Sequence, residues 1–117
     1  MKVKTTREGL VGGHTATGWI IDTKMPFVAL PALRALRRFV RVTNPANGRS
    51  CLAIVLDVGP WNINDNNYVF LKHRPQAESG IDTTGRSTNG AGIDLGEAVW
   101  AALGLSDNTE VEWEFIE

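Results

Sequence analysis

Two short segments each place one aspartate beside an apolar run and a glycine. Asp57 stands in Leu-Asp-Val-Gly-Pro-Trp and directly follows the apolar residues 51–56. Asp94 stands in Gly-Ile-Asp-Leu-Gly and directly precedes the amphipathic residues 95–103. A carboxyl group at the exit of a core strand and another at the start of a helix can meet in one cleft. Such a pair predicts a general acid/base site, where one carboxyl donates a proton and a carboxylate accepts one.

The elements that must hold these aspartates are short strands. Apolar and β-branched residues run or alternate between turn signals, which predicts strands at 3–6, 17–21, 27–30, 39–43, 51–56 and 111–116. Asn47-Gly48 predicts a tight two-residue turn, because both central positions of such a turn need φ > 0. Six or so short strands in 117 residues predict an all-β fold, a small closed barrel with two short helices.

The two predicted helices cover residues 31–38, where Pro31 suits a first turn, and 94–103. In the second, Asp94 would be the N-cap, with Glu97 as its capping-box partner. Asp94 therefore has a second interpretation as a plain cap. Asp57 likewise has one as a turn residue that accepts backbone N–H groups. Both interpretations stay open beside the catalytic one.

Composition predicts one domain over residues 1–117, because 43% of them are hydrophobic, which is enough for a core. The net charge of −1 argues against a nucleic-acid partner. A lone cysteine, Cys51, excludes a disulfide within the chain and is expected to be a buried, inert thiol. The histidines His14 and His73 show no ligand spacing with it, so neither a metal site nor a cofactor is expected.

The chain has no apolar run of about 18 residues, so no membrane span is predicted. Its first eight residues lack the apolar stretch of a signal peptide. The expected location is periplasmic or extracellular if a signal has been trimmed, and cytoplasmic or phage-associated otherwise. The sequence indicates no oligomeric state.

Residues 62–91 form a polar stretch whose only apolar island is 68–71. A segment this long is unusual as a simple connection in so small a domain. We therefore expect a long loop insertion with a functional role.

Several segments, taken in order, resemble the rare lipoprotein A-like domains. They are Thr-Ala-Thr-Gly at 15–18, Val-Ala-Leu-Pro at 28–31, Val-Thr-Asn-Pro-Ala-Asn-Gly-Arg-Ser at 42–50, Asp-Val-Gly-Pro-Trp at 57–61, Ile-Asp-Leu-Gly at 93–96 and Ala-Ala-Leu-Gly at 101–104. The resemblance implies a six-stranded double-psi β-barrel, as in expansins, barwin, family 45 endoglucanases and MltA-type lytic transglycosylases. It also implies cleavage of peptidoglycan glycan strands or, as in expansins, non-hydrolytic loosening of wall polysaccharide.

In several barrel relatives the aspartate of the second motif is the catalytic acid, and it corresponds to Asp94. The first-motif aspartate corresponds to Asp57. A lytic transglycosylase uses an acid to protonate the glycosidic oxygen and then accepts a proton from the 6-hydroxyl of the sugar. A hydrolase uses two carboxyl groups instead. We expect Asp94 to be the acid and Asp57 its partner.

Four further residues are candidates for contact with a polysaccharide. Trp61 and Tyr68 have aromatic faces that can stack on sugar rings, or can pin the long loop to the barrel. Thr17 belongs to the threonine-alanine element of the family and would line the site, or it is an ordinary strand threonine. His73 in the loop would either touch the substrate or remain solvated.

The chain departs from the family pattern in the motifs themselves. Val58 replaces the usual arginine, Trp61 the usual phenylalanine or tyrosine, and Gly96 the usual serine. The connection between the two aspartate motifs is also much longer than in the family. These departures favour two alternatives to cleavage: a non-catalytic, expansin-like module that binds or loosens polysaccharide, and a structural or interaction domain.

Overall fold

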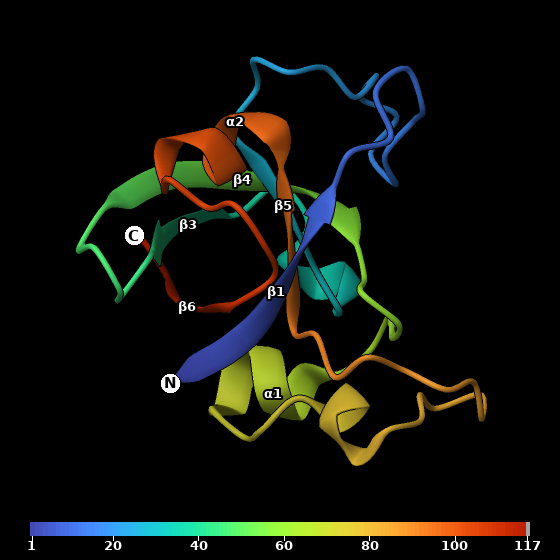
Figure 1. Cartoon of the computed structure of the whole chain (residues 1–117). Coiled ribbons are helices and arrows are strands. Elements are labelled where there is room, and N and C mark those ends of the chain that lie inside the picture. The colour runs from blue at the N-terminus through green and yellow to red at the C-terminus, as the bar shows by residue number, and fades with distance from the viewer. Residues whose placement is uncertain (117) are drawn as a thin grey trace.

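Six strands close into a barrel in the computed structural model, which describes residues 1–116. The strands are β1 (Lys2–Glu8), β2 (Phe27–Leu30), β3 (Phe39–Thr43), β4 (Ser50–Val58), β5 (Ile93–Gly96) and β6 (Glu110–Phe115). They pair in the order β1-β5-β2-β4-β3-β6, and β6 returns to β1 (Figure 1). The β1–β5 and β2–β4 pairs are parallel, whereas the other pairs are antiparallel. The predicted all-β fold with two short helices is confirmed.

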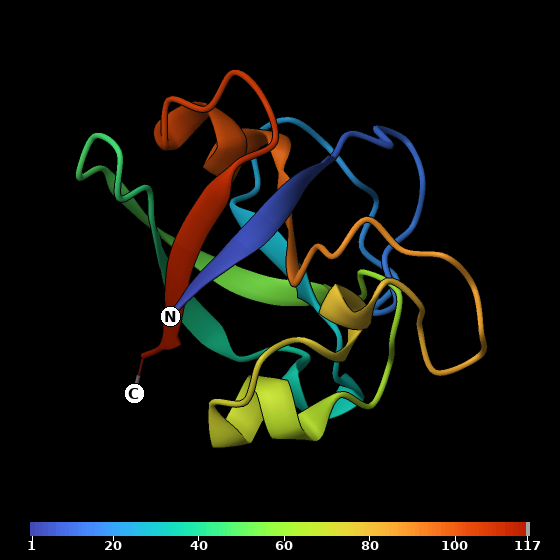
Figure 2. The ribbon, with the colours of Figure 1, turned by 60° about the horizontal axis from the view of Figure 1, so that its bottom comes forward.

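The helical elements are short and lie outside the barrel. They are η1 (Leu33–Ala35), α1 (Asn66–Leu71), η2 (Gln76–Ser79) and α2 (Glu97–Ala102). The two α-helices lie on opposite sides of the barrel in both views (Figures 1 and 2). The segments at 9–26 and 80–91 project from the same side of the molecule in both views.

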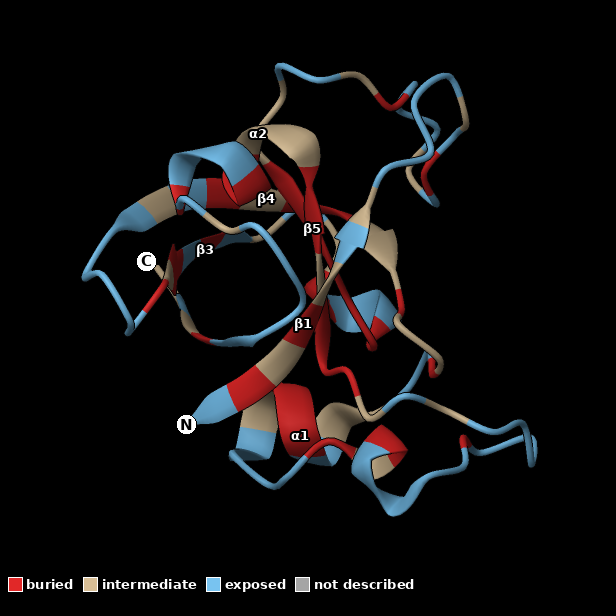
Figure 3. Cartoon of the chain, viewed as in Figure 1, coloured by how far each residue is buried: buried red, intermediate tan, exposed pale blue. Residues whose placement is uncertain are grey.

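The core fills the barrel because alternate side chains of each strand point inward. The fully buried apolar side chains on the strands include Val3, Val28, Leu30, Val40, Val42, Val55, Ile93, Leu95 and Val111 (Figure 3). Burial of each such side chain contributes about 1.5–3 kcal/mol. Thr5 also points inward, where its hydroxyl donates to the carbonyl of Ile93 at 3.2 Å.

A second apolar cluster lies outside the barrel. Ile21 packs there with Phe27 of β2 and Leu56 of β4, and all three are buried. This cluster attaches residues 9–26 to the two strands.

Several predicted elements differ in the structure. Residues 17–21 form no strand and contribute only an isolated bridge between His14 and Ile20. The predicted helix at 31–38 shortens to η1, and Arg37 beyond it has a φ of 69°, outside the helical region. The strands predicted at 3–6, 51–56 and 111–116 are present as β1, β4 and β6, but their observed ends differ from the predicted ones.

The predicted two-residue turn at Asn47-Gly48 is wrong. Only Gly48 of that pair has a positive φ, 75°, and the β3–β4 connection spans residues 44–49. The buried Asn44 and its neighbour Asn47 both donate through Nδ2 to the carbonyl of Leu103, at 3.0 Å each. The longer connection therefore supports the end of α2.

The predicted capping box at Asp94 is also wrong. Asp94 lies within β5, α2 begins three residues later, and its N-cap Gly96 offers no side chain. Glu97 pairs instead with Arg7 of β1 at 2.6 Å. Pairing with strands on both sides keeps the backbone of Asp94 extended, which overrides the local helix signal.

Candidate active site

One row of paired residues crosses the outer wall of the barrel and carries both predicted aspartates. Thr6 of β1 pairs with Asp94 of β5, Asp94 with Ala29 of β2, and Ala29 with Asp57 of β4. Directly paired residues present their side chains on the same face. Strands lie about 4.8 Å apart, so the backbones of the two aspartates are about 10 Å apart, with Ala29 between them along the row.

Asp94 is partly buried in β5. The hydroxyl of Thr6 donates to its Oδ1. Burial raises the pKa of Asp94 to about 6, the Thr6 hydrogen bond opposes that rise, and the charge of Asp57 adds to it. Asp94 can therefore exchange a proton near neutral pH.

Asp57 is held by main-chain donors. Its Oδ1 accepts a hydrogen bond from the N–H of Ala16 at 2.8 Å and from its neighbour Val58 at 3.0 Å. Backbone N–H groups thus hold Asp57 without an arginine at position 58. The turn interpretation of Asp57 and its place beside Asp94 are both compatible with this geometry.

A third carboxyl group, Glu8 at the end of β1, joins the two aspartates. Burial raises its pKa to about 8, with further contributions from a hydrogen bond with Asp57 and from the charges of Asp57 and Asp94. Its Oε2 is buried and accepts no N–H or O–H group from residues 1–116. Sequence reasoning missed Glu8, although a strand prolonged by two residues beyond 3–6 would have placed it on the same face as Thr6.

The segment at 9–26 borders the row beside Asp57. Thr17 lies there, next to Ala16, and its hydroxyl donates to the carbonyl of Leu56 at 2.9 Å. The same hydroxyl lies 2.9 Å from that of Thr15. The structure therefore places Thr17 near Asp57, with its hydroxyl already engaged by the main chain.

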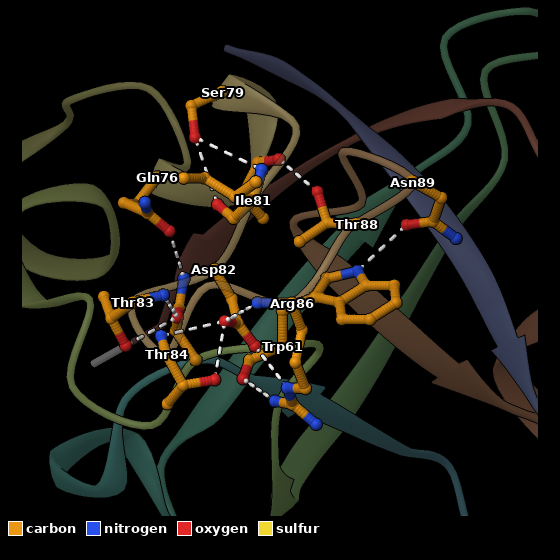
Figure 4. A network of polar contacts seen from close by, with 12 residues as sticks. Trp61, Gln76, Ser79, Ile81, Asp82, Thr83, Thr84, Arg86, Thr88 and Asn89 are labelled. Carbon is orange, nitrogen blue, oxygen red and sulfur yellow. Dashed lines mark hydrogen bonds and ion pairs between the residues drawn. The ribbon is translucent and has the colours of Figure 1, made fainter.

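Trp61 lies in the other segment, at 59–92. Its Nε1 donates to Oδ1 of Asn89 at 3.0 Å, and the guanidinium of Arg86 lies 5.9 Å from the ring centroid (Figure 4). The main-chain carbonyl of Asn89 accepts a hydrogen bond from Nζ of Lys4 at 2.9 Å. Along β1, Lys4 lies on the same face as Thr6 and Glu8, because they are spaced two residues apart. Asn89 therefore links the indole to the strand face that bears Glu8.

A polar network orders the part of residues 62–91 around Asp82 (Figure 4), whereas Tyr68 and Val69 of α1 pack into the apolar core. Asp82 is 2% exposed and accepts hydrogen bonds from the N–H and hydroxyl of Thr84 and from the N–H and Nε of Arg86. These hydrogen bonds hold the pKa of the Asp82 carboxyl below its usual range, against the effect of its burial. The predicted long loop thus contains α1, η2 and a fixed turn around Asp82.

Two predicted substrate contacts do not reach the row. Tyr68 is 3% exposed. Its hydroxyl donates a hydrogen bond to the Gly92 carbonyl at 3.0 Å and accepts one from Nε1 of Trp113 at 2.7 Å. It pins the segment to the barrel and presents no free face to a sugar. His73 follows α1 next to Arg74, which donates to the carbonyl of Lys2 at 2.9 Å. That places it at the opposite end of β1 from Glu8, about 20 Å away at 3.3 Å per residue.

A cleft of about 580 Å³ opens elsewhere, between α1 and β6. Its lining includes Phe70, Trp113 and Phe115 but none of the three carboxyl residues. Within residues 1–116, no group of three or more His, Cys, Asp or Glu side chains is arranged to hold a metal ion. No helix in the same range is long and apolar enough to cross a membrane.

The barrel and its aspartate motifs define a double-psi β-barrel domain of the rare lipoprotein A-like, expansin-like class. More particularly, residues 1–114 match the family described as "Domain of unknown function (DUF8814)", and the chain belongs to that family.

A curated relative supports the class. The chain is 33% identical over 105 residues to the "Endolytic peptidoglycan transglycosylase RlpA" of Yersinia pestis, a match that covers 90% of the chain. The chain spans 22% of the length of that relative.

Two solved structures share the fold. The "Streptomyces papain inhibitor (SPI)" is 21% identical with a TM-score of 0.55, and the match covers 100% of this chain and 94% of the other. Cerato-platanin 3 from M. perniciosa is 9% identical with a TM-score of 0.58, and the match covers 100% and 95%. The resemblance inferred from the ordered motifs is confirmed, as is the double-psi fold.

Proposed function

We propose that this domain cleaves the glycan strands of peptidoglycan as a lytic transglycosylase, with Asp94 as general acid/base and Asp57 as its partner. One observation carries the proposal: both aspartates lie in one row of the barrel wall, on either side of Ala29. The sequence likeness to an endolytic peptidoglycan transglycosylase supports the substrate class.

The reaction needs a proton at one oxygen and the loss of a proton at another. A protonated carboxyl donates to the glycosidic oxygen while the bond from that oxygen to C1 breaks. The 6-hydroxyl oxygen then bonds to C1, and its proton passes to a carboxylate. The pKa of Asp94, about 6, suits exchange in both directions near neutral pH.

Substrate contacts would come from the two segments beside the row. Trp61 offers an indole held in place by Asn89, and an aromatic ring of this kind can stack on the apolar face of a sugar. Thr17 would line the opposite border near Asp57. Because peptidoglycan lies outside the cytoplasmic membrane, the proposal includes a periplasmic or extracellular location.

The test is muropeptide analysis after purified sacculi are digested. The wild type should release anhydro-muropeptides, and Asp94→Asn should release at least about 100-fold less, since a positioned acid/base contributes that much or more. Asp107→Asn is the matched control, because Asp107 is an exposed loop aspartate. An absence of soluble product from the wild type would overturn the proposal.

A second candidate is a non-catalytic module that binds or loosens wall polysaccharide. The departures at Val58 and Gly96 favour it. Glycan-dependent quenching of tryptophan fluorescence that persists in Asp94→Asn, without product from the wild type, would support this function. No binding to any glycan would instead indicate a structural or interaction domain.

A further inference from the structure

We propose that Glu8 is a third catalytic carboxyl of this site and that it donates the proton to the glycosidic oxygen, while Asp57 and Asp94 act as carboxylates. The inference rests on the proposed function and changes the donor within it. No sequence motif pointed to Glu8.

Like charges surround Glu8. Glu8 feels the charges of both Asp57 and Asp94, so the three carboxyl groups share one site. The ion pairs formed among residues 1–116 engage other acidic side chains, namely Glu78, Asp82, Glu97 and Glu114. Burial and these two like charges both disfavour the ionised form, so one of the three carboxyl groups holds a proton.

The hydrogen bonds at the site identify which carboxyl holds the proton. Asp57 accepts two backbone N–H groups and Asp94 accepts the Thr6 hydroxyl, as ionised carboxylates do. Glu8 has a buried Oε2 that accepts no N–H or O–H group from the described residues. A carboxyl with one oxygen buried and without a donor favours the neutral form, in which it can itself donate to Asp57.

The pKa values agree with this distribution. At neutral pH Glu8, with a pKa of about 8, is largely protonated, whereas Asp94, with a pKa of about 6, is largely ionised. The ionisable groups that act on Glu8 are Asp57 of β4 and Asp94 of β5. The neighbouring cation, Arg7, is engaged by Glu97 of α2.

The reaction balances with these roles. The Glu8 proton moves to the glycosidic oxygen, which leaves C1 with the bonding electron pair. The 6-hydroxyl oxygen forms the new bond to C1, and its proton passes to the Asp94 carboxylate. That proton then returns to Glu8, so one cycle neither gains nor loses a proton.

The first experiment compares cleavage of purified sacculi by the wild type, Glu8→Gln and Glu8→Asp. Glu8→Gln keeps the size of the side chain and a donor toward Asp57, but it has no acidic proton to give. We expect it to release at least about 100-fold less anhydro-muropeptide, with an unchanged circular dichroism spectrum. Glu114→Gln is the matched control, because Glu114 is an exposed strand glutamate and should retain full activity.

The pH profile distinguishes a donor from a structural residue. Activity of the wild type should fall as pH rises through about 8, where Glu8 loses its proton. Glu8→Asp should keep part of the activity and shift this alkaline limb. An unshifted limb would overturn the inference.

A second readout needs no activity. In protein labelled with ¹³C at glutamate carboxyls, one resonance should titrate near pH 8 and disappear in Glu8→Gln. If Glu8→Gln cleaves sacculi at the wild-type rate, or if Glu8 titrates below pH 6, the inference is wrong and the proposed function stands. If the wild type releases no product, both the inference about Glu8 and the proposed function are wrong.

Discussion

At the residue scale, Trp61 shows how a candidate sugar-binding side chain is fixed. Its Nε1 is bound to Asn89, one side of its ring faces Arg86, and its own carbonyl accepts Nη2 of Arg86 at 2.9 Å. A ring already held in place loses little conformational freedom when a ligand stacks on it, so the stacking energy is retained.

We expect Trp61→Ala to weaken glycan binding about tenfold, equivalent to about 1.4 kcal/mol. Trp61→Phe should lose less, since it keeps an aromatic face and forfeits only the bond to Asn89. Isothermal titration with soluble glycan fragments measures both changes. Phe39→Ala serves as control because Phe39 is an exposed aromatic of β3; equal losses in Trp61→Ala and Phe39→Ala would argue against a platform at Trp61.

At the element scale, the junction of β5 and α2 depends on Gly96. A Cβ at this position would lie 2.5 Å from Cε1 of Phe27, a fully buried ring of β2. The large side chain of Phe27 therefore explains why position 96 is a glycine and not the serine that is usual in the family. Phe27 fills the space where a side chain at position 96 would go.

Gly96→Ala should destabilise the domain by about 1–3 kcal/mol, because it overpacks this contact. Phe27→Leu should recover part of the loss when it is combined with Gly96→Ala, and urea denaturation of both single variants and the double variant measures the coupling. Additive losses would show that the Phe27 contact does not explain the glycine.

Part of the carboxyl site could be predicted from the sequence. Asp57 and Asp94 lie in local motifs, so their convergence could be predicted once a barrel was expected. Glu8 lies in no motif, and its contact with Asp57 depends on the pairing of distant strands, so only a longer first strand could have pointed to it. The capping signal at Asp94 failed for the same reason: tertiary pairing with β1 and β2 outweighed a local pattern.

At the scale of the whole molecule, the carboxyl row couples the stability of the barrel to pH. Unfolding lowers the pKa of Glu8 from about 8 to 4.5 and that of Asp94 from about 6 to 3.8. Between these limits the folded state binds more protons than the unfolded chain, so the free energy of unfolding falls as pH rises. This contribution is complete below about pH 4 and is lost by about pH 8.

We therefore expect the domain to resist urea better at pH 5 than at pH 8.5. Glu8→Gln should flatten this dependence above pH 6, because only the Asp94 contribution remains and it is confined to lower pH. Glu114→Gln should leave the slope unchanged. A free energy of unfolding that rises from pH 5 to 8.5 in the wild type would contradict the prediction.

The pairing of β1 with β5 and β6 has a consequence for biosynthesis. Thr5 and Ile93 hydrogen-bond across 88 positions of sequence, so a nascent chain exposes β1 on the ribosome until both late strands have emerged. An unpaired strand invites aggregation, and charged side chains along it discourage wrong partners. The basic residues Lys2, Lys4 and Arg7 can protect the waiting strand, and the three carboxyl groups meet only after β5 has emerged.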